Sequence, residues 1–231
     1  MNMRNSQEDI FIKHEADAFY ERNFSRLSVP VPQNHNVIKS IKNIKLPKSA
    51  SFIDLGGGSG AVTAGIKKSQ PSWKGTVLEP SKKATKLGSK IFPWINFVNG
   101  SITKKKDMPK KTYDLAIISM VFSWIDRSLL SQAIANVDNL VKPEGYILIH
   151  DFYTPFARAN SYHHKEGLFT YKQDYTQPFL SLNTYTEVFR NLGKDANTSF
   201  DKDDQYDATT MVAVLQKEVQ ILFTVIPGKN V

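Results

Sequence analysis

Ser51-Phe-Ile-Asp-Leu-Gly-Gly-Gly-Ser-Gly60-Ala-Val-Thr-Ala-Gly65 decides the fold, because this stretch predicts a strand, a turn and a helix in succession. The apolar residues before the glycines are typical of a strand buried on both faces. Gly56, Gly58 and Gly60 allow backbone angles closed to other residues and leave no Cβ between the main chain and a ligand. The helix expected from about Ser59 to Lys68 points unpaired N–H groups at the turn. We expect a nucleotide-like ligand there, with a ligand-free glycine turn as the alternative.

A second strand, Gly75 to Glu79, ends in an acidic residue. Glu79 follows the last glycine of the turn by roughly twenty residues, the position that accepts ribose hydroxyls in dinucleotide-type folds. A carboxylate suits this role because its two oxygens accept two donors at once. The alternative is an ordinary solvated glutamate before a turn.

Two further motifs follow in order. The four are Asp54-Leu-Gly56-Gly-Gly58-Ser-Gly60, Glu79, Tyr113-Asp-Leu-Ala-Ile-Ile-Ser119-Met and Lys142-Pro-Glu-Gly145-Tyr-Ile-Leu-Ile. Together they resemble a class I S-adenosylmethionine (SAM)-dependent methyltransferase over about residues 48–153. The D-x-G-x-G-x-G spacing favours SAM over NAD. The resemblance implies an α/β fold with a doubly wound, seven-stranded, mostly parallel sheet (Rossmann-like) and an N-terminal helical lid.

The resemblance also implies SAM as cofactor, with S-adenosyl-L-homocysteine as product. The residues expected to contact it are Asp54, Gly56, Gly57, Gly58, Gly60, Glu79, Ser101, Ile102, Ser119, Met120 and Tyr20. The family usually has an acid where Ser101 stands, hydrogen-bonded to the adenine amino group. A serine hydroxyl or the main-chain N–H of Ile102 can still pair with the ring.

Composition bounds the remaining possibilities. At 231 residues and 41% hydrophobic content, we expect one domain with a substantial core. No apolar run is long enough to span a bilayer, the N-terminus is too polar for a secretory signal, and there are no cysteines, so we expect a cytoplasmic protein. The net charge of +8 allows a polyanionic partner, but the lysines are scattered. The dense run from Lys104 to Lys111 is expected to be a solvated loop, with a phosphate or nucleic-acid contact as the alternative.

The N-terminal 5–27 segment is expected to be a helix that Pro30 and Pro32 terminate. Its Glu15–Asn23 part is similar to the lid of small-molecule methyltransferases, so Tyr20 or Arg22 is a candidate for the cofactor carboxylate. Packing of an amphipathic helix on the core explains the same pattern.

The other elements are predicted as follows. Helices are expected at Asn34–Ile44, Pro80–Ile91, Arg127–Leu140 and Asn183–Leu192, the last ending at Gly193; strands at Ile95–Val98, Tyr113–Ser119, Tyr146–Ile149, Thr209–Gln216 and Val219–Ile226; and a polar loop at Asp195–Asp207. The single domain 1–231 divides into a helical cap (1–47), a SAM-binding core (48–153), a substrate-side insertion (154–181), and a last helix with a C-terminal strand hairpin (182–231).

Candidate acceptor residues follow the fourth and fifth strands. The loop Met120–Trp124 resembles the family loop beside the methionine part of SAM, although Trp124 also suits core packing. His150 and Asp151 end the fifth strand, where groups act on substrate or support those that do. The segment Arg158–Tyr175 lacks helical or strand periodicity and is rich in tyrosine and histidine, so it predicts either a substrate-specificity loop or a surface loop with aromatic anchors. The candidates are His150, His163 and His164 for catalysis, and Trp124, Asp151, Tyr153, Tyr162, Tyr171 and Tyr175 for substrate binding.

No metal site is predicted, because the adjacent His163 and His164 are expected to point apart and no acid stands at helical spacing from them. We expect methyl transfer to a hydroxyl of a sugar-like or other small polar acceptor, with a histidine or aspartate accepting the proton. An RNA methyltransferase is one alternative, favoured by charge. The Met-Val-Phe-Ser loop differs from the Asn/Asp-Pro-Pro-Tyr/Phe loop of base-amino enzymes, and no RNA-binding module is appended. A non-catalytic SAM-binding protein is the other. No nucleic-acid or membrane partner is expected.

Overall fold

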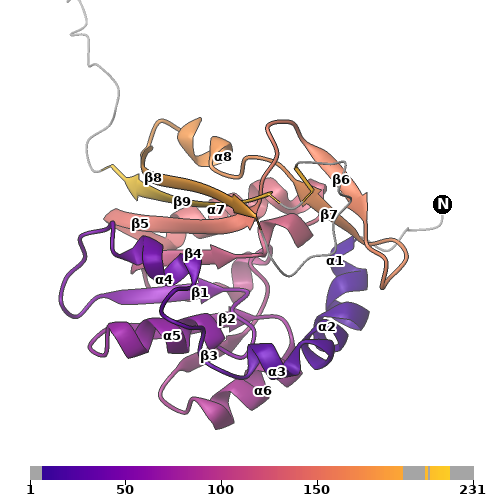
Figure 1. The fold of residues 1–231 in the computed structure, drawn as a ribbon, viewed down its shortest axis with the longest axis horizontal. Helices are drawn as coiled ribbons and strands as arrows, with labels where there is room; N and C mark the ends of the chain where they lie inside the picture. Colours follow the sequence, from indigo (N-terminus) through magenta and orange to yellow (C-terminus); the bar gives the residue numbers. More distant parts are fainter. Residues whose placement is uncertain (1–6, 195–205, 208, 219–231) are drawn as a thin grey trace, which may run out of the picture.

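The computed structural model describes residues 7–194, 206–207 and 209–218. Seven strands form one sheet in the order β3-β2-β1-β4-β5-β9-β8, and β6 and β7 pair separately (Figure 1). Strands β1 to β5 are parallel neighbours, whereas β9 runs antiparallel between β5 and β8. The predicted α/β class, with a doubly wound, mostly parallel seven-stranded sheet, is therefore confirmed. No helix in the described ranges is long and apolar enough to cross a membrane.

The element bounds lie close to the predicted ones through the first half of the chain. The strands are β1 (Ser51–Leu55), β2 (Lys74–Glu79), β3 (Asn96–Asn99), β4 (Tyr113–Ser119), β5 (Val141–Phe152), β6 (Arg158–Ser161), β7 (Phe169–Lys172), β8 (Tyr185–Lys194) and β9 (Thr209–Lys217). The helices of the core are α4 (Asn36–Ile41), α5 (Ala61–Ser69), α6 (Lys82–Ile91), α7 (Leu130–Leu140) and α8 (Gln177–Leu180). Short 3-10 turns are η2 (Lys105–Asp107), η3 (Phe122–Trp124) and η4 (Arg127–Leu129).

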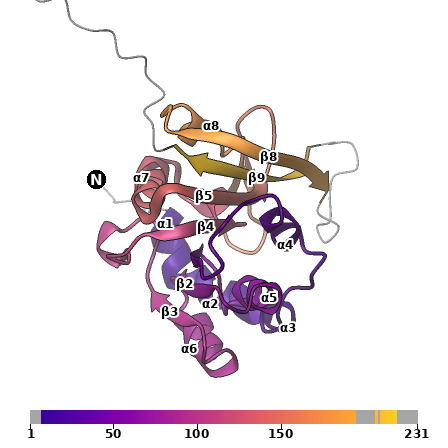
Figure 2. The ribbon, with the colours of Figure 1, turned by 90° about the vertical axis from the view of Figure 1, so that its left-hand side faces the viewer.

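The sheet is buried on both faces because its strands alternate between two apolar clusters. Phe52 faces a cluster shared with α4 and α5, and its neighbour Ile53 faces a cluster shared with α7 and α8. Figures 1 and 2 show these helices on opposite sides of the central strands. This layering leaves the carboxyl ends of the parallel strands as the edge where ligands bind in such folds.

The N-terminal segment is helical, as predicted, but it is not one helix. It consists of α1 (Gln7–Ile10), a π-helical turn η1 (Phe11–Glu15), α2 (Ala16–Arg22) and α3 (Phe24–Leu27). The break after α2 has a local cause, because the Asn23 side-chain amide donates to Phe19 O (2.8 Å) and competes with the helical ladder. The predicted positions before Gln7 lie outside the described residues.

The prediction of a helix at Asn183–Leu192 is wrong, since Tyr185–Lys194 is β8, the edge strand that pairs with β9. Thr186, Val188 and Phe189 are β-branched or aromatic, and pairing along β9 supplies the hydrogen bonds that decide their conformation. Gly193 therefore ends no helix. The predicted strand at 209–216 is confirmed as β9, but its hairpin partner is β8. The predicted strand Val219–Ile226 and residues 195–205 of the predicted loop lie outside the described residues.

The segment Arg158–Tyr175, predicted to be a loop because it lacks strand periodicity, contains two strands. β6 and β7 form an antiparallel pair, with Arg158 opposite Lys172 and Ser161 opposite Phe169. Each strand has only four residues, too few for an alternating pattern to be distinguished from chance in the sequence. We call residues 158–172 the β6–β7 hairpin.

Candidate functional site

The glycine loop joins β1 to α5 and uses its glycines for different reasons. Gly56, Gly58 and Gly60 all have positive φ, at 72°, 57° and 87°. A Cβ on Gly56 would lie 2.5 Å from Val121 Cγ2, so that glycine is needed for packing between loops. A Cβ on Gly58 would meet no atom within 4 Å, so the main chain faces open space there. Gly58 is thus the position where a ligand can lie directly against the loop.

The carboxylate of Glu79 lies beside this space, at the end of β2. Gly58 N–H donates to its Oε2 (2.9 Å) and Ser81 N–H donates to its Oε1 (2.8 Å). The pKa of Glu79 is raised to about 7, chiefly by burial and to a smaller extent by the nearby Asp54 and Asp17 carboxylates, against the two N–H donors, which lower it. Two oriented oxygens at a strand end fit the predicted pairing with ribose hydroxyls, which stays a prediction.

Asp54 lies behind the loop. Its Oδ2 accepts a hydrogen bond from Thr63 Oγ1 on α5 (2.9 Å), and a Cβ on Gly57 would lie 2.7 Å from its carboxyl carbon. Full burial raises the pKa of Asp54 to about 6. These contacts show a carboxyl group that ties the loop to α5; direct contact with a cofactor stays a prediction.

The loop after β3 holds the predicted adenine contacts Ser101 and Ile102, both buried. Ser101 N–H donates to Asp107 Oδ2 (2.9 Å), and the carbonyl of Ile102 accepts from Asn136 Nδ2 on α7 (2.7 Å). The Ser101 hydroxyl donates to Oε1 of Glu8 on α1 (2.9 Å). Glu8 was not a predicted site residue, because nothing local marks a contact between positions 93 residues apart.

The Asp151 carboxylate holds the loop after β4 by hydrogen bonds to its main chain. Val121 N–H (3.0 Å) and Ser123 N–H (3.2 Å) both donate to its Oδ2, and Phe152 N–H donates to its Oδ1 (2.8 Å). Burial raises the pKa of Asp151 to about 6. Asp151 therefore supports the loop, which is one of the two roles that the sequence left open. Its hydrogen bonds to the main chain do not favour the predicted contact with substrate. Met120, with φ of 58°, donates its N–H to His150 O (2.7 Å).

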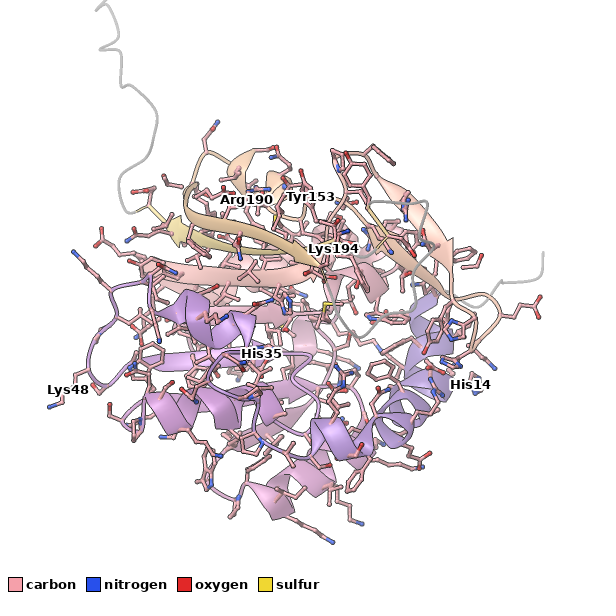
Figure 3. All side chains as sticks on the ribbon, viewed as in Figure 1. His14, His35, Lys48, Tyr153, Arg190 and Lys194 are labelled. Carbon is pink, nitrogen blue, oxygen red and sulfur yellow. The ribbon has the colours of Figure 1, made fainter. Side chains whose placement is uncertain are left out.

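Ser119 ends β4 and lies opposite His150 of the neighbouring strand β5, and their side chains meet. Nδ1 of His150 lies 3.0 Å from Ser119 Oγ. His35, the residue before α4, packs edge-on against the His150 ring with 5.7 Å between ring centres, and burial lowers the pKa of His35. Figure 3 shows His35 well inside the outline of the molecule and His14 at the outer side of the N-terminal helices. Sequence reasoning missed His35 because it lies 115 positions from His150.

Trp124 lies where the N-terminal helices meet the β6–β7 hairpin. Its ring contacts Phe11 (5.7 Å between centres), Phe19 (6.0 Å) and, edge-on, Tyr162 of the hairpin (4.8 Å). Gln7 Nε2 donates to the carbonyls of Trp124 and Phe169, each at 2.9 Å. Trp124 therefore packs among aromatic side chains, which was the alternative interpretation of this residue. Its contact with an acceptor stays a prediction.

Tyr162 joins the hairpin to η1 and α2. Its hydroxyl donates to Glu15 Oε1 (3.1 Å) and accepts from Arg22 Nη2 (3.1 Å), while Arg22 also pairs with Glu15. Arg22 is thus engaged in this cluster, and the Tyr20 hydroxyl lies 3.4 Å from Ser28 Oγ. Their predicted contact with the cofactor carboxylate stays a prediction. We call Glu15, Arg22 and Tyr162 the lid clasp.

The other predicted site residues of the segment Arg158–Tyr175 divide between surface and core. His163 and His164 are exposed at the turn with ring centres 3.9 Å apart, so the expectation that they point apart is wrong. Among the described residues, no group of three or more histidine, cysteine, aspartate or glutamate side chains is arranged to hold a metal ion.

Tyr175 is a core residue. It is 1% exposed, stacks on Phe122 (5.4 Å) and donates to Tyr171 O (2.8 Å); burial raises its pKa. Tyr171 is half-buried, with the Arg127 guanidinium 4.2 Å from its ring centre. Tyr153 donates its N–H to Thr209 O (3.0 Å) and is half-buried. Substrate contact stays a prediction for these tyrosines, and the burial of Tyr175 does not favour it.

A cleft of about 520 Å³ lies at the opposite edge of the sheet. Its lining includes Asp114 near the start of β4 and Glu144 near the start of β5. Ligands of doubly wound sheets bind outside the carboxyl ends of the strands, so we do not assign the site to this opposite edge.

Comparison with known proteins identifies the family to which this chain belongs. A family model described as a methyltransferase domain matches residues 13–196. A malonyl-[acyl-carrier protein] O-methyltransferase of Halalkalibacterium halodurans is 29% identical over 107 residues, which is 44% of this chain and 39% of that relative. The match thus spans less than half of either protein.

Two solved structures have the same fold. A chain of the Haloferax volcanii complex that contains the Trm112 methyltransferase activator superposes with a TM-score of 0.68 at 14% identity, covering 90% of this chain and 98% of that one. The Burkholderia thailandensis 1,6-didemethyltoxoflavin-N1-methyltransferase, solved with 1,6-didemethyltoxoflavin and S-adenosylhomocysteine, has a TM-score of 0.57 at 14% identity, covering 91% and 80%. At this identity the likeness shows the fold alone.

Proposed function

Because this chain belongs to the methyltransferase-domain family and is a SAM-dependent methyltransferase, we propose that its acceptor is a hydroxyl of a small, polar, sugar-like molecule. The observation that carries the proposal is the pair of Ser119 Oγ and His150 Nδ1, 3.0 Å apart near the carboxyl ends of β4 and β5. A hydroxyl must lose its proton when it is methylated, and an imidazole is the side chain best matched to accept one near neutral pH.

The residues of the carboxyl edge fit the cofactor. Gly58 offers main chain without a Cβ next to open space, and the Glu79 carboxylate lies beside it to accept ribose hydroxyls. SAM supplies a methyl group on a positively charged sulfur. The protein's part is to align the acceptor oxygen opposite that sulfur, and such alignment lowers barriers by up to about 7–11 kcal/mol in well-oriented systems.

In this proposal the proton of the acceptor moves to the imidazole of His150. The Ser119 hydroxyl fixes the orientation of that ring, and His35 packs against its side. His163 and His164 are exposed on the hairpin turn, so they are better placed to bind the acceptor from solvent than to accept its proton. Among the predicted catalytic histidines, we therefore assign the proton transfer to His150.

The test is S-adenosylhomocysteine formation with three acceptor pools: a panel of sugars and sugar nucleotides, total RNA, and malonyl-acyl carrier protein. We expect turnover with the panel and a fall of about 10²–10⁴-fold in His150→Gln, with SAM affinity retained. His14→Gln, on an exposed histidine of the lid, is the matched control and should keep full activity. Turnover with RNA but not with the panel would overturn the proposal.

A second candidate is the carboxylate oxygen of a malonyl group on an acyl carrier protein, which the partial match to the malonyl-[acyl-carrier protein] enzyme favours. The exposed lysines along α6 have a charge opposite to that of a carboxylate. They are Lys82, Lys83, Lys86 and Lys90. A carboxylate is already ionised near neutral pH and needs no base, so His150→Gln would then leave turnover nearly unchanged.

A further inference from the structure

Glu8 lies at the carboxyl edge of the sheet although it belongs to the N-terminal lid. Its Oε1 accepts hydrogen bonds from the hydroxyls of Ser101 and Thr103, which are each 6% exposed. These two hydroxyls also lie 2.8 Å from each other, so the three side chains form one cluster over the loop after β3. A carboxylate from α1 is thus fixed next to a loop that begins 92 residues further along the chain.

The strand order places this cluster at the carboxyl edge, in line with the glycine loop and Glu79, where a bound nucleoside would extend. The glycine loop follows β1, Glu79 ends β2, and the loop with Ser101 follows β3, the next strand outward. Main-chain and side-chain bonds hold the ends of β2 and β3 together, because Gly100 N–H (3.1 Å) and Asn99 Nδ2 (2.9 Å) both donate to Glu79 O. A nucleoside with its ribose on Glu79 and its sulfur toward β4 therefore places its base over the loop after β3.

The base of SAM is adenine, which presents an exocyclic amino group as a hydrogen-bond donor. The Ser101 hydroxyl gives its hydrogen to Glu8, and the Ser101 main-chain N–H is used by Asp107. The two hydrogen bonds that Glu8 accepts from described residues both fall on Oε1, and its second oxygen has acceptor capacity toward a ligand. A carboxylate is also the stronger acceptor for an amino group than a hydroxyl would be.

We propose that Glu8 is a specificity-determining residue that accepts a hydrogen bond from the adenine amino group and so selects adenine over bases without that donor. This inference depends on SAM binding at the carboxyl edge but not on the identity of the acceptor. It also explains why α1 lies against the loop after β3: the lid residue completes the base site. Closure of the lid and recognition of the base are then one event.

The test compares two ligands in calorimetry, S-adenosylhomocysteine and S-inosylhomocysteine, in which an oxo group replaces the amino group. The wild-type protein should bind the adenosine compound at least about tenfold more tightly. Glu8→Ala should lose about tenfold for the adenosine compound and nothing for the inosine compound, so that the preference disappears. Glu21→Ala is the matched control, since Glu21 is a lid glutamate that instead pairs with the exposed Lys83.

Other outcomes overturn the proposal in distinguishable ways. Equal losses for both ligands in Glu8→Ala, together with a lower melting temperature, would show that Glu8 only anchors α1. Loss of the preference in Asp107→Asn but not in Glu8→Ala would assign the base contact to Asp107. Wild-type protein that binds neither ligand would contradict the cofactor site itself, whereas an unsuccessful search for an acceptor hydroxyl would leave this comparison intact.

Discussion

The two halves of the sheet's carboxyl edge are built by different means. Around β1 and β2, main-chain groups set the geometry, because Gly58 N–H and Ser81 N–H orient Glu79 over a loop with three positive-φ glycines. Around the β6–β7 hairpin, side chains meet side chains across long separations, as Tyr162 and Glu15 do over 147 positions. Main-chain geometry restricts which residues fit, whereas side-chain contacts admit many pairs. The first half should therefore tolerate substitution poorly and the second half more readily.

The largest expected effect comes from Gly58→Val, which fills the open space before the loop and requires a β-branched residue at φ of 57°. We expect SAM affinity to fall about a hundredfold or more while the far-UV circular dichroism spectrum stays native. Gly193→Val is the control, because Gly193 lies on edge strand β8 and an added Cβ there also meets nothing within 4 Å. Wild-type affinity in Gly58→Val would place the cofactor elsewhere.

A smaller loss is expected for Glu79→Gln, which keeps the size of the side chain but removes its charge. A lost charge-assisted hydrogen bond corresponds to about 1.5–3 kcal/mol, or roughly 10–100-fold in SAM affinity by calorimetry. Asp54→Asn is the matched variant behind the loop, where Thr63 occupies the carboxylate. It should lower the melting temperature more than the affinity. The reverse pattern would exchange the roles of the two acids.

The fold was more predictable than the site, because local patterns fix strands and turns whereas contacts between distant side chains leave no local pattern. The strands β1 to β5 follow apolar runs that must be buried, so Ile53, Ile117 and Leu148 mark them without any tertiary information. β8 was predicted as a helix because its hydrogen-bond partner β9 comes later in the chain and turns a weak local preference into an edge strand. Four-residue strands such as β6 are too short for a periodic pattern.

Site residues divide along the same line. Gly58 and Glu79 were candidates because the strand–turn–helix geometry restricts what can stand there, and the structure brings them together. Glu8 and His35 were missed because they are distant in the sequence from the sites they reach, Glu8 on α1 and His35 just before α4, and a glutamate or histidine at such a position has many ordinary explanations. Tyr175 was offered as a substrate contact because aromatic density does not distinguish a ring on the surface from one stacked on Phe122.

A further test uses pH, since burial raises the pKa of Glu79 from 4.5 to about 7. Ribose hydroxyls bind best to the ionised carboxylate, so SAM affinity should increase about tenfold from pH 6 to pH 8, with proton release on binding. The stability of the ligand-free protein should change in the opposite sense. A raised acid pKa means that the folded state binds more protons than the unfolded state between pH 4.5 and about 7, so the contribution of Glu79 is lost as pH rises through that window.

Glu79→Gln separates this group from the other buried acids. Asp54 and Asp151, whose pKa values are raised to about 6, lower stability over an overlapping range and remain in the variant. Calorimetry at pH 6, 7 and 8 should therefore show affinity that no longer depends on pH, while thermal melts keep part of their slope. An affinity that still rises tenfold in the variant would assign the titrating group elsewhere.

The smallest effects are expected on the hairpin, where Tyr162→Phe and Tyr171→Phe form a matched pair of half-buried tyrosines. Tyr162→Phe removes the hydroxyl that joins Glu15 and Arg22 in the lid clasp, so SAM should dissociate a few-fold faster in stopped-flow measurements, as expected for a hydrogen bond of about 0.5–1.5 kcal/mol.

Tyr171→Phe leaves the clasp and the Arg127 stacking intact, so SAM affinity should hold while methyl transfer to the acceptor falls. If Tyr171→Phe and His163→Phe both lose SAM affinity and thermal stability, the hairpin belongs to the cofactor lid. If both variants transfer methyl groups normally, the acceptor must be bound by Trp124 and His150 instead. The acceptor site would then depend on as few residues as the cofactor site does.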